Sequence, residues 1–281
     1  MNTSAQAADA PQPQAPALLL ENITCTFAAG SAGSAPYTAV GNTTLAIGRG
    51  EFVSVVGPTG CGKSTLLNIA AGLLAPSAGR VSIFGTPLHG INRSAGYLFQ
   101  ADALMPWMSA LDNIAIGPVF RGADGAAARE RAQQWLQRVG LAGHGHRYPH
   151  QLSGGMKKRV ALAQTLILDP QILLMDEPFS ALDIQTRQLM ENELLELWSA
   201  DRKSVVFITH DLEEAIALSD RVVVLSAGPA THPIGEFVID LPRPRDVAEI
   251  RLTPRFVDLH RDIWAAMKDE VLKGYAQSKQ A

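Results

Sequence analysis

Residues 57–64 read GPTGCGKS and fit the pattern G-x-x-x-x-G-K-[ST]. Loops with this pattern wrap the phosphate chain of a nucleoside triphosphate when a strand precedes them and a helix follows. Both are expected here, because the apolar, β-branched run 52–56 is typical of a buried strand and the run 65–71 can form a helix. The setting predicts an α/β fold and favours a nucleotide site over a glycine-rich turn that binds nothing.

Each residue type in the loop has a physical role. Glycines allow the tight turn that points backbone N–H groups at phosphate oxygens, and the helix N-terminus adds its positive dipole end. Lys63 is expected to reach the β- and γ-phosphates, and the Ser64 hydroxyl to ligate Mg²⁺. The predicted nucleotide contacts are Gly57, Pro58, Thr59, Gly60, Cys61, Gly62, Lys63, Ser64 and Thr65.

Composition narrows the class of protein. Of the 281 residues 47% are hydrophobic, which is enough for a sizeable core, and the net charge of −3 shows no basic excess that would point to nucleic acid as a partner. No apolar run approaches the roughly 18 residues that span a bilayer, so at a membrane another chain must provide the spans. Residues 1–17 lack the basic start and apolar centre of a secretory signal, and their Ala/Pro/Gln bias predicts a disordered tail.

Two cysteines occur, Cys25 and Cys61. A disulfide at Cys61 would distort the phosphate loop, so both are expected to be free thiols in a reducing cytoplasm.

The pattern along the chain alternates between strands and helices, which is α/β order. A long, largely helical stretch over 110–168 interrupts the alternation, and a proline-bearing tail with an amphipathic helix ending near residue 273 closes the chain. The expected strands are 18–27, 38–47, 52–56, 81–84, 96–100, 172–175, 205–208 and 221–225, and the later helices are 184–200 and 212–218.

Two carboxylates follow the apolar strand 172–175. Ligands bind at the carboxyl edge of open α/β sheets, so Asp176 can hold the Mg²⁺ shell there. Glu177, one residue further on, can accept a proton from, or orient, the water that attacks the γ-phosphate. The alternative is a pair of acidic residues that merely end a strand and cap the next helix.

Residues 152–156, LSGGM, place a serine and two glycines at the start of a helical run. The free N–H groups of a helix N-terminus make a second anion site, and the simplest way to use both sites is for two chains to share each nucleotide. The alternative is that Ser153 is an ordinary N-cap.

From 18 to 225 the chain resembles the ATP-binding subunit of an ABC transporter. Residues 57–64 match the Walker A motif, 172–177 Walker B, 152–156 the family signature, 180–183 the D-loop, Gln100 the Q-loop glutamine and His210 the switch histidine. The resemblance implies a P-loop NTPase fold with a mixed sheet, an antiparallel β subdomain and a helical subdomain over about 101–168. The ATP-binding domain would then cover 18–240, and a C-terminal extension 241–281.

The resemblance also implies roles for single residues. ATP and Mg²⁺ would bind between two head-to-tail copies, with catalytic roles for Glu177, His210 and Gln100. Metal ligation falls to Ser64, Gln100 and Asp176. Adenine would stack on an aromatic residue, for which Phe27 fits best and Tyr37 is the rival, unless that residue belongs to the core. The residues that act on the ATP of the other copy are Ser153, Gly154, Gly155 and Asp183.

One departure points to a subgroup. Met156 stands where glutamine is commonest, and this is similar to importers of nitrate, sulfonate and taurine, as are the segments 104–107 (LMPW), 112–114 and 241–245 and the helix near Trp264. Such importers imply a separate transmembrane permease, an external solute-binding protein and a peripheral location on the cytoplasmic face of the inner membrane. Pro106 and Trp107 would dock the permease, or Trp107 would pack in the local core.

Other functions remain as alternatives. An ABC exporter is one alternative, although Met156 in the signature and the segment 106–107 favour import. A soluble ABC ATPase of DNA repair or translation usually carries a coiled-coil insertion or a second nucleotide module, and neither is present. A P-loop GTPase would carry an N-K-x-D motif, which this sequence lacks.

Overall fold

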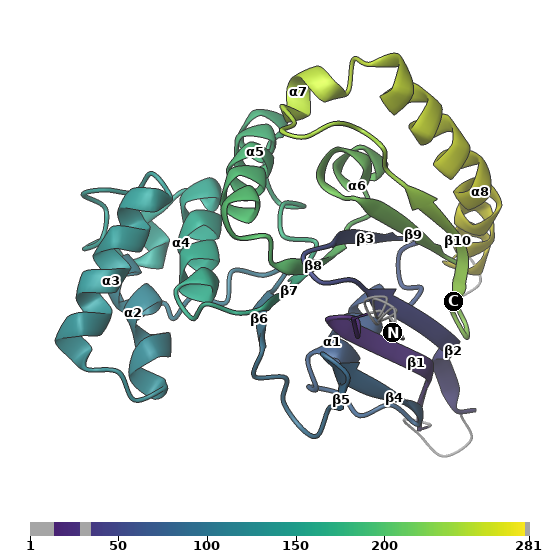
Figure 1. The fold of residues 1–281 in the computed structure, drawn as a ribbon, viewed down its shortest axis with the longest axis horizontal. Coiled ribbons are helices and arrows are strands. Elements are labelled where there is room, and N and C mark those ends of the chain that lie inside the picture. Colours follow the sequence, from purple (N-terminus) through teal and green to yellow (C-terminus); the bar gives the residue numbers. More distant parts are fainter. Residues whose placement is uncertain (1–13, 29–34, 279–281) are drawn as a thin grey trace, which may run out of the picture.

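A computed structural model describes residues 14–28 and 35–278 (Figure 1). Its centre is a six-stranded sheet in the order β10-β9-β3-β8-β7-β6. Neighbours from β9 to β6 run parallel, and β10 pairs antiparallel with β9 at one edge. The strands are β3 (Phe52–Val56), β6 (Ala95–Leu98), β7 (Ile172–Asp176), β8 (Ser204–Ile208), β9 (Arg221–Leu225) and β10 (Pro233–Val238).

A second, four-stranded antiparallel sheet has the order β2-β1-β4-β5. Helix α1 (Lys63–Ala70) lies against it and against the central sheet (Figure 1). The strands are β1 (Leu18–Phe27), β2 (Tyr37–Ile47), β4 (Ala78–Ile83) and β5 (Thr86–Pro87). Ala17 is buried, and its N–H donates to the carbonyl of Ile47, so it belongs to the fold and not to the tail predicted over 1–17. Residues 1–13 of that tail lie outside the described residues.

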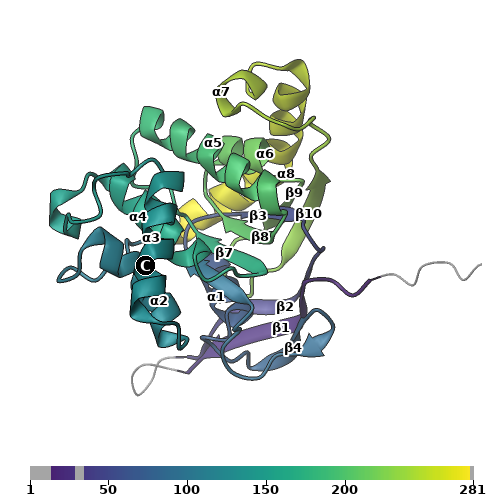
Figure 2. The ribbon, with the colours of Figure 1, turned by 60° about the vertical axis from the view of Figure 1, so that its left-hand side comes forward.

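Helices cover the rest of the molecule. One group stands to the side of the sheets, as Figure 2 shows, and consists of α2 (Ala110–Phe120), α3 (Gly125–Arg138), the short 3-10 helix η1 (Pro149–Gln151) and α4 (Gly154–Leu166). The others are α5 (Ile184–Asp201), α6 (Leu212–Leu218), α7 (Val247–Ile250) and α8 (Pro254–Ser278). The mixed sheet, the antiparallel sheet and the helical group confirm the predicted fold class.

Strand β3 shows why the central sheet is buried on both faces. Its side chains alternate between the faces, as strand geometry requires. Phe52 and Val56 pack with the cluster of α4, α5, α6 and α8, while Val53 and Val55 pack with the cluster that contains α1 and the antiparallel sheet. All five residues of β3 are buried, so the loop that follows leaves a rigid base.

Some elements differ from the prediction. Strand β6 ends at Leu98, so Gln100 lies on the loop beyond the strand and not at its end. Helix α8 runs to Ser278, past the predicted end near residue 273. Strand β10 and helix α7 were not predicted, because short segments with weak periodicity are stabilised by tertiary contacts. Among the described residues, no helix has the length and apolarity needed to cross a membrane.

Candidate nucleotide site

The phosphate loop connects β3 to α1, as predicted. Gly60 and Gly62 have φ angles of 75° and 116°, in the left-handed region that favours glycine. A Cβ at Gly62 would also lie 3.1 Å from the carbonyl oxygen of Ala39 and 3.1 Å from Cγ2 of Thr231. The loop geometry therefore requires glycine both for its backbone angle and for the room around it.

Lys63 is held by the loop that precedes it. Its side chain is buried, and Nζ donates to the carbonyls of Gly57 and Pro58, both at 2.9 Å. A buried ammonium needs such partners, since an unpaired charge away from water is costly. The loop thus fixes one positive charge at the N-terminal end of α1.

A cavity of about 430 Å³ opens over this loop. It brings together three parts of the chain that are far apart in sequence: the phosphate loop with the start of α1, the segment after β6, and the ends of β7 and β8. The lining residues are Thr59, Gly60, Gly62, Lys63, Ser64, Thr65, Gln100, Glu177 and His210. Most of the predicted nucleotide and catalytic residues therefore share one cavity.

Asp176 ends β7 beside the start of α1. The Ser64 hydroxyl donates to Asp176 Oδ1 at 3.0 Å. Burial raises the pKa of the Asp176 carboxyl, and the Ser64 hydrogen bond opposes that shift. The described residues hold no group of three or more His, Cys, Asp or Glu side chains suited to a metal. A hydroxyl and a carboxylate nevertheless supply hard oxygen donors, and these fit a Mg²⁺ ion that shares its shell with phosphate oxygens.

Glu177 lies where the other two predicted catalytic side chains meet. Its Oε2 lies 3.0 Å from His210 Nδ1, and Gln100 Nε2 donates to the same oxygen at 3.3 Å. The backbone of Glu177 has φ 42°, which is rare for a residue with a side chain, and its N–H donates to the carbonyl of Ile208 at 2.9 Å. The main chain thus holds the carboxylate at the cavity in a conformation that costs energy.

The signature residues lie apart from this cavity. Ser153 is the N-cap of α4, and its hydroxyl accepts from the N–H of Met156 at 3.3 Å. Asp183 caps α5 in the same way, accepting from Thr186 N–H at 3.0 Å. Neither they nor Gly154 and Gly155 line the cavity of their own chain. Their role on the nucleotide of another copy stays a prediction.

The two candidate aromatic residues are neighbours. Phe27 and Tyr37 face each other across β1 and β2, with 42% and 48% of their surface exposed, so neither is a core residue. Neither lines the phosphate cavity. The choice between them for adenine stacking stays open. The intervening loop, residues 29–34, lies outside the described residues.

The structure tests two further expectations from the sequence, the state of the cysteines and the exposure of Trp107. Cys25 and Cys61 are both free and buried, and burial raises the pKa of each thiol. Trp107 is 74% exposed, so it does not pack in the local core. The alternative of core packing is therefore wrong, and the docking role of Trp107 stays a prediction.

Sequence reasoning missed Lys158. This residue of α4 is almost fully buried, and its ammonium donates to the carbonyl of Gln100 at 2.6 Å and pairs with Asp102 at 3.0 Å. Lys158 thereby ties the signature helix to the loop that carries Gln100. The available signal was a lysine on the inward side of a helical run, which sequence alone cannot distinguish from a surface lysine.

Cavity, loop and carboxylates define a P-loop nucleotide-binding protein. A family model described as "ABC transporter" matches residues 40–180. An uncharacterized ABC transporter ATP-binding protein of Methanocaldococcus jannaschii is 47% identical over 236 residues, 84% of this chain and 86% of that protein. The chain belongs to the ABC transporter family and is an ATP-binding subunit.

Two relatives carry functional names. Taurine import ATP-binding protein TauB of Burkholderia pseudomallei is 42% identical over 227 residues, 79% of this chain and 87% of its own. Nitrate import ATP-binding protein NrtD of Synechococcus elongatus is 41% identical over 231 residues, 81% and 84% of the two chains. A solved dimeric ATP-binding cassette in a post-hydrolysis state with ADP and Pi has a TM-score of 0.70 and 34% identity, covering 80% of this chain and 100% of its own.

Proposed function

We propose that this chain hydrolyses ATP to power the import of a small anion, such as nitrate, a sulfonate or taurine, through a separate membrane subunit. One observation supports the chemistry above all others: Gln100 and His210 both contact Glu177 Oε2 in the cavity that also holds Lys63. The names of the taurine and nitrate import relatives support the substrate class.

Within one chain, the phosphate loop and Lys63 bind the phosphates of ATP by oriented N–H groups and charge. Ser64, Asp176 and Gln100 would hold Mg²⁺, which neutralises charge on the β- and γ-phosphates when bound. Glu177 orients the attacking water and accepts its proton, and His210 positions Glu177 by the contact at 3.0 Å.

The second half of each site comes from a second copy in a head-to-tail dimer. Ser153, Gly154 and Gly155 would present the N-terminus of α4, and Asp183 the end of the D-loop, to ATP held by the partner. Charge stabilisation by oriented donors is the largest usual term in such chemistry. The dimeric state named for the solved cassette supports this arrangement.

The remaining partners follow from the importer class. A transmembrane permease would dock at exposed Trp107 on the cytoplasmic face of the inner membrane, with an external solute-binding protein delivering the anion. ATP-driven closure and reopening of the dimer would move the permease between its states. We keep the division into an ATP-binding domain over 18–240 and an extension over 241–281 as part of this proposal.

The test is anion uptake in the source cell after deletion of this gene. Uptake of nitrate, taurine or another sulfonate should fall, and the wild-type gene should restore it while Glu177→Gln should not. Purification of the chain from native membranes should recover a polytopic protein. Loss of efflux in place of uptake would assign the chain to an exporter, and recovery only with ribosomes or DNA would contradict a transport role.

A further inference from the structure

A second, larger groove borders the nucleotide cavity. It has a volume of about 630 Å³ and lies between α8 and the segment that follows β8. His210 lines both the groove and the nucleotide cavity, so the two are adjacent. The groove is lined by Ile184, Arg187, His210, Asp211, Leu212, Glu213, Arg251, His260, Trp264 and Met267.

Helix α8 is asymmetric across its exposed surface. At 100° per residue, its buried side carries Phe256, Leu259, Ile263 and Met267. One flank of this side carries charged residues: Arg255, Asp262, Asp269 and Lys273. The opposite flank, which we call the Trp264 flank, carries Val257, His260, Trp264 and Val271 together with one charged residue, Lys268.

The Trp264 flank leaves apolar surface in contact with water. Val257 is 56% exposed and Trp264 is 43% exposed. Across the groove, Ile184 is 71% exposed and directly follows the D-loop residue Asp183. Single exposed apolar residues are ordinary, but here exposed Trp264 and exposed Ile184 both line one groove, with Val257 on the same flank outside it. Exposed apolar side chains gathered in this way are typical of an interaction site.

The far end of α8 reaches the phosphate loop. Glu270 Oε2 accepts from the N–H of Ala227, just after β9, at 2.8 Å. A Cβ at Gly274 would lie 3.0 Å from Cβ of Pro58, the second residue of the phosphate loop. Helix α8 therefore runs along the edge of the nucleotide site, from the His210 end to the Pro58 end.

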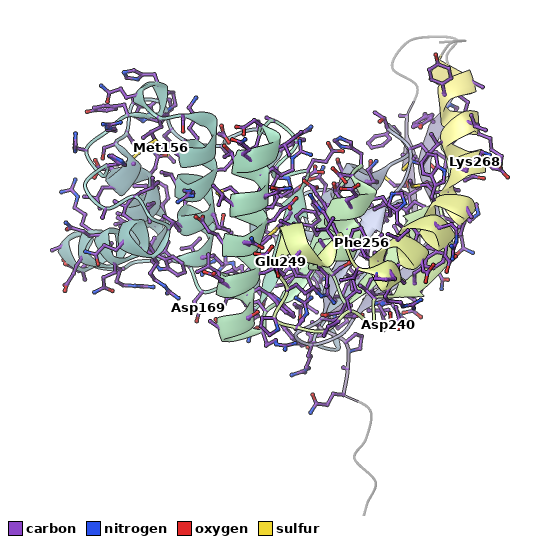
Figure 3. The ribbon with its side chains drawn as sticks, turned by 90° about the horizontal axis from the view of Figure 1, so that it is seen from above. Met156, Asp169, Asp240, Glu249, Phe256 and Lys268 are labelled. Atoms are coloured by element: carbon purple, nitrogen blue, oxygen red, sulfur yellow. The ribbon has the colours of Figure 1, made fainter. Side chains whose placement is uncertain are left out.

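The position of the signature indicates which part of a second copy would approach this edge of the nucleotide site. Figure 3 shows Met156, the last residue of the signature, at one end of the molecule and Lys268 of α8 at the other. In a head-to-tail dimer, the signature side of one copy approaches the phosphate loop of the other, which is the end where α8 lies. A two-fold axis repeats the contact, so each copy would contribute one groove.

We propose that the Trp264 flank and exposed Ile184 form part of the interface with a second copy of this chain in the ATP-bound dimer. The inference rests on the proposed function, because it takes the head-to-tail dimer from there. The groove shares His210 with the cavity that the second copy would close, and tryptophan is among the residue types that contribute most at protein interfaces.

The experiment measures the dimer dissociation constant by sedimentation in the Glu177→Gln background, with saturating ATP and Mg²⁺. Adding Trp264→Ala should raise this constant at least about tenfold, as expected for an interface tryptophan. Val257→Asp, on the same flank, should do the same. The matched control is Trp107→Ala, which removes an exposed tryptophan outside this groove and should leave the constant unchanged. ATP binding to the monomer and the melting temperature check that each variant is folded.

The outcomes separate the two proposals. If Gly154→Asp abolishes the dimer while Trp264→Ala and Val257→Asp leave it intact, the dimer stands and the Trp264 flank is excluded from it. If the Trp264→Ala chain dimerises normally but loses its membrane subunit, the flank belongs to that subunit and the inference is wrong. If the parent Glu177→Gln chain stays monomeric with ATP, both the dimer and this inference fail.

Discussion

The phosphate-loop half and the signature half of the chain are built differently. Around the phosphate loop, side chains from three parts of the chain already contact one another, with Ser64 on Asp176 and both Gln100 and His210 on Glu177. Around the signature, Ser153 and Asp183 each cap their own helix and lie outside that cavity. The phosphate-loop half is assembled within one chain, whereas the signature half is the exposed N-terminal end of a helix. The difference is consistent with the proposed head-to-tail dimer, in which a single chain would bind ATP while catalysis would need two.

Glu177→Gln tests the assembled half most severely. The amide keeps the shape but cannot accept a proton, so ATP hydrolysis should fall on the order of 10³-fold while ATP binding is retained. Phosphate release under saturating ATP, with fluorescent nucleotide titration alongside, measures both. Turnover near the wild-type rate would remove Glu177 from its role.

Gly154→Asp tests the signature half. A Cβ there meets only Leu182 Cδ2 at 3.7 Å, and an acidic residue at a helix N-terminus stabilises the helix, so the fold should be intact. Negative charge facing the partner's γ-phosphate should cut hydrolysis on the order of 10²-fold, with nucleotide binding to the monomer unchanged.

The control for this variant is Gly125→Asp, at the first position of α3, where a Cβ meets nothing within 4 Å. It makes the same change at another helix start and should be silent. If ATP hydrolysis falls equally in both variants, the effect comes from added negative charge at any helix start and not from the signature.

Lys158→Met tests the link between the halves. It removes the ammonium that holds the Gln100 carbonyl and Asp102, and the loss of a buried charged hydrogen bond should cost about 1–3 kcal/mol of stability. Hydrolysis should drop about tenfold through kcat, with little change in ATP affinity and partial rescue by Lys158→Arg. Lys157→Met is the control. A variant with lower stability and normal kcat would make Lys158 purely structural.

Glu191→Gln has the smallest expected effect on ATP hydrolysis, because Glu191 does not line the nucleotide cavity and its effect is on stability. Glu191 is fully buried on α5 and paired with Arg251 at 3.2 Å, and burial raises its pKa to about 8. Because the pKa of the Glu191 carboxyl is higher in the folded chain than in the unfolded chain, folding is favoured when this carboxyl is protonated. That contribution is complete below pH 4.5 and is lost as pH rises through about 8.

Glu191→Gln removes this titration. The free energy of unfolding of the variant should therefore rise relative to that of the wild type as pH rises from 5 to 8, by at most about 1.4 kcal/mol per pH unit. Urea unfolding at several pH values measures the slope, and Glu196→Gln, exposed on the same helix, should follow the wild type. Parallel slopes for the wild type and Glu191→Gln would contradict the raised pKa.

Much of the fold and part of the site could be predicted from sequence. The phosphate loop, the strand before it and the two carboxylates at the end of β7 were predictable because short runs of glycine, β-branched and acidic residues determine them locally. Helix α7, strand β10 and the role of Lys158 were not, because each depends on packing between segments far apart in the chain. Strand β6 shows the limit of prediction from sequence. The strand itself was predicted, but its end before Gln100 was not.

By itself, the sequence determined a P-loop nucleotide-binding chain with the motifs of an ABC transporter subunit. Glycines at fixed spacing and a lysine at the start of a helix are sufficient to specify a phosphate-binding loop. Only the tertiary structure decided that Gln100 and His210, 77 and 33 residues away from Glu177, contact one carboxylate oxygen. It also decided that α8 lies along the edge of the nucleotide site. Such contacts depend on how the sheet and helices pack, and burial of apolar surface fixes that packing over the whole chain.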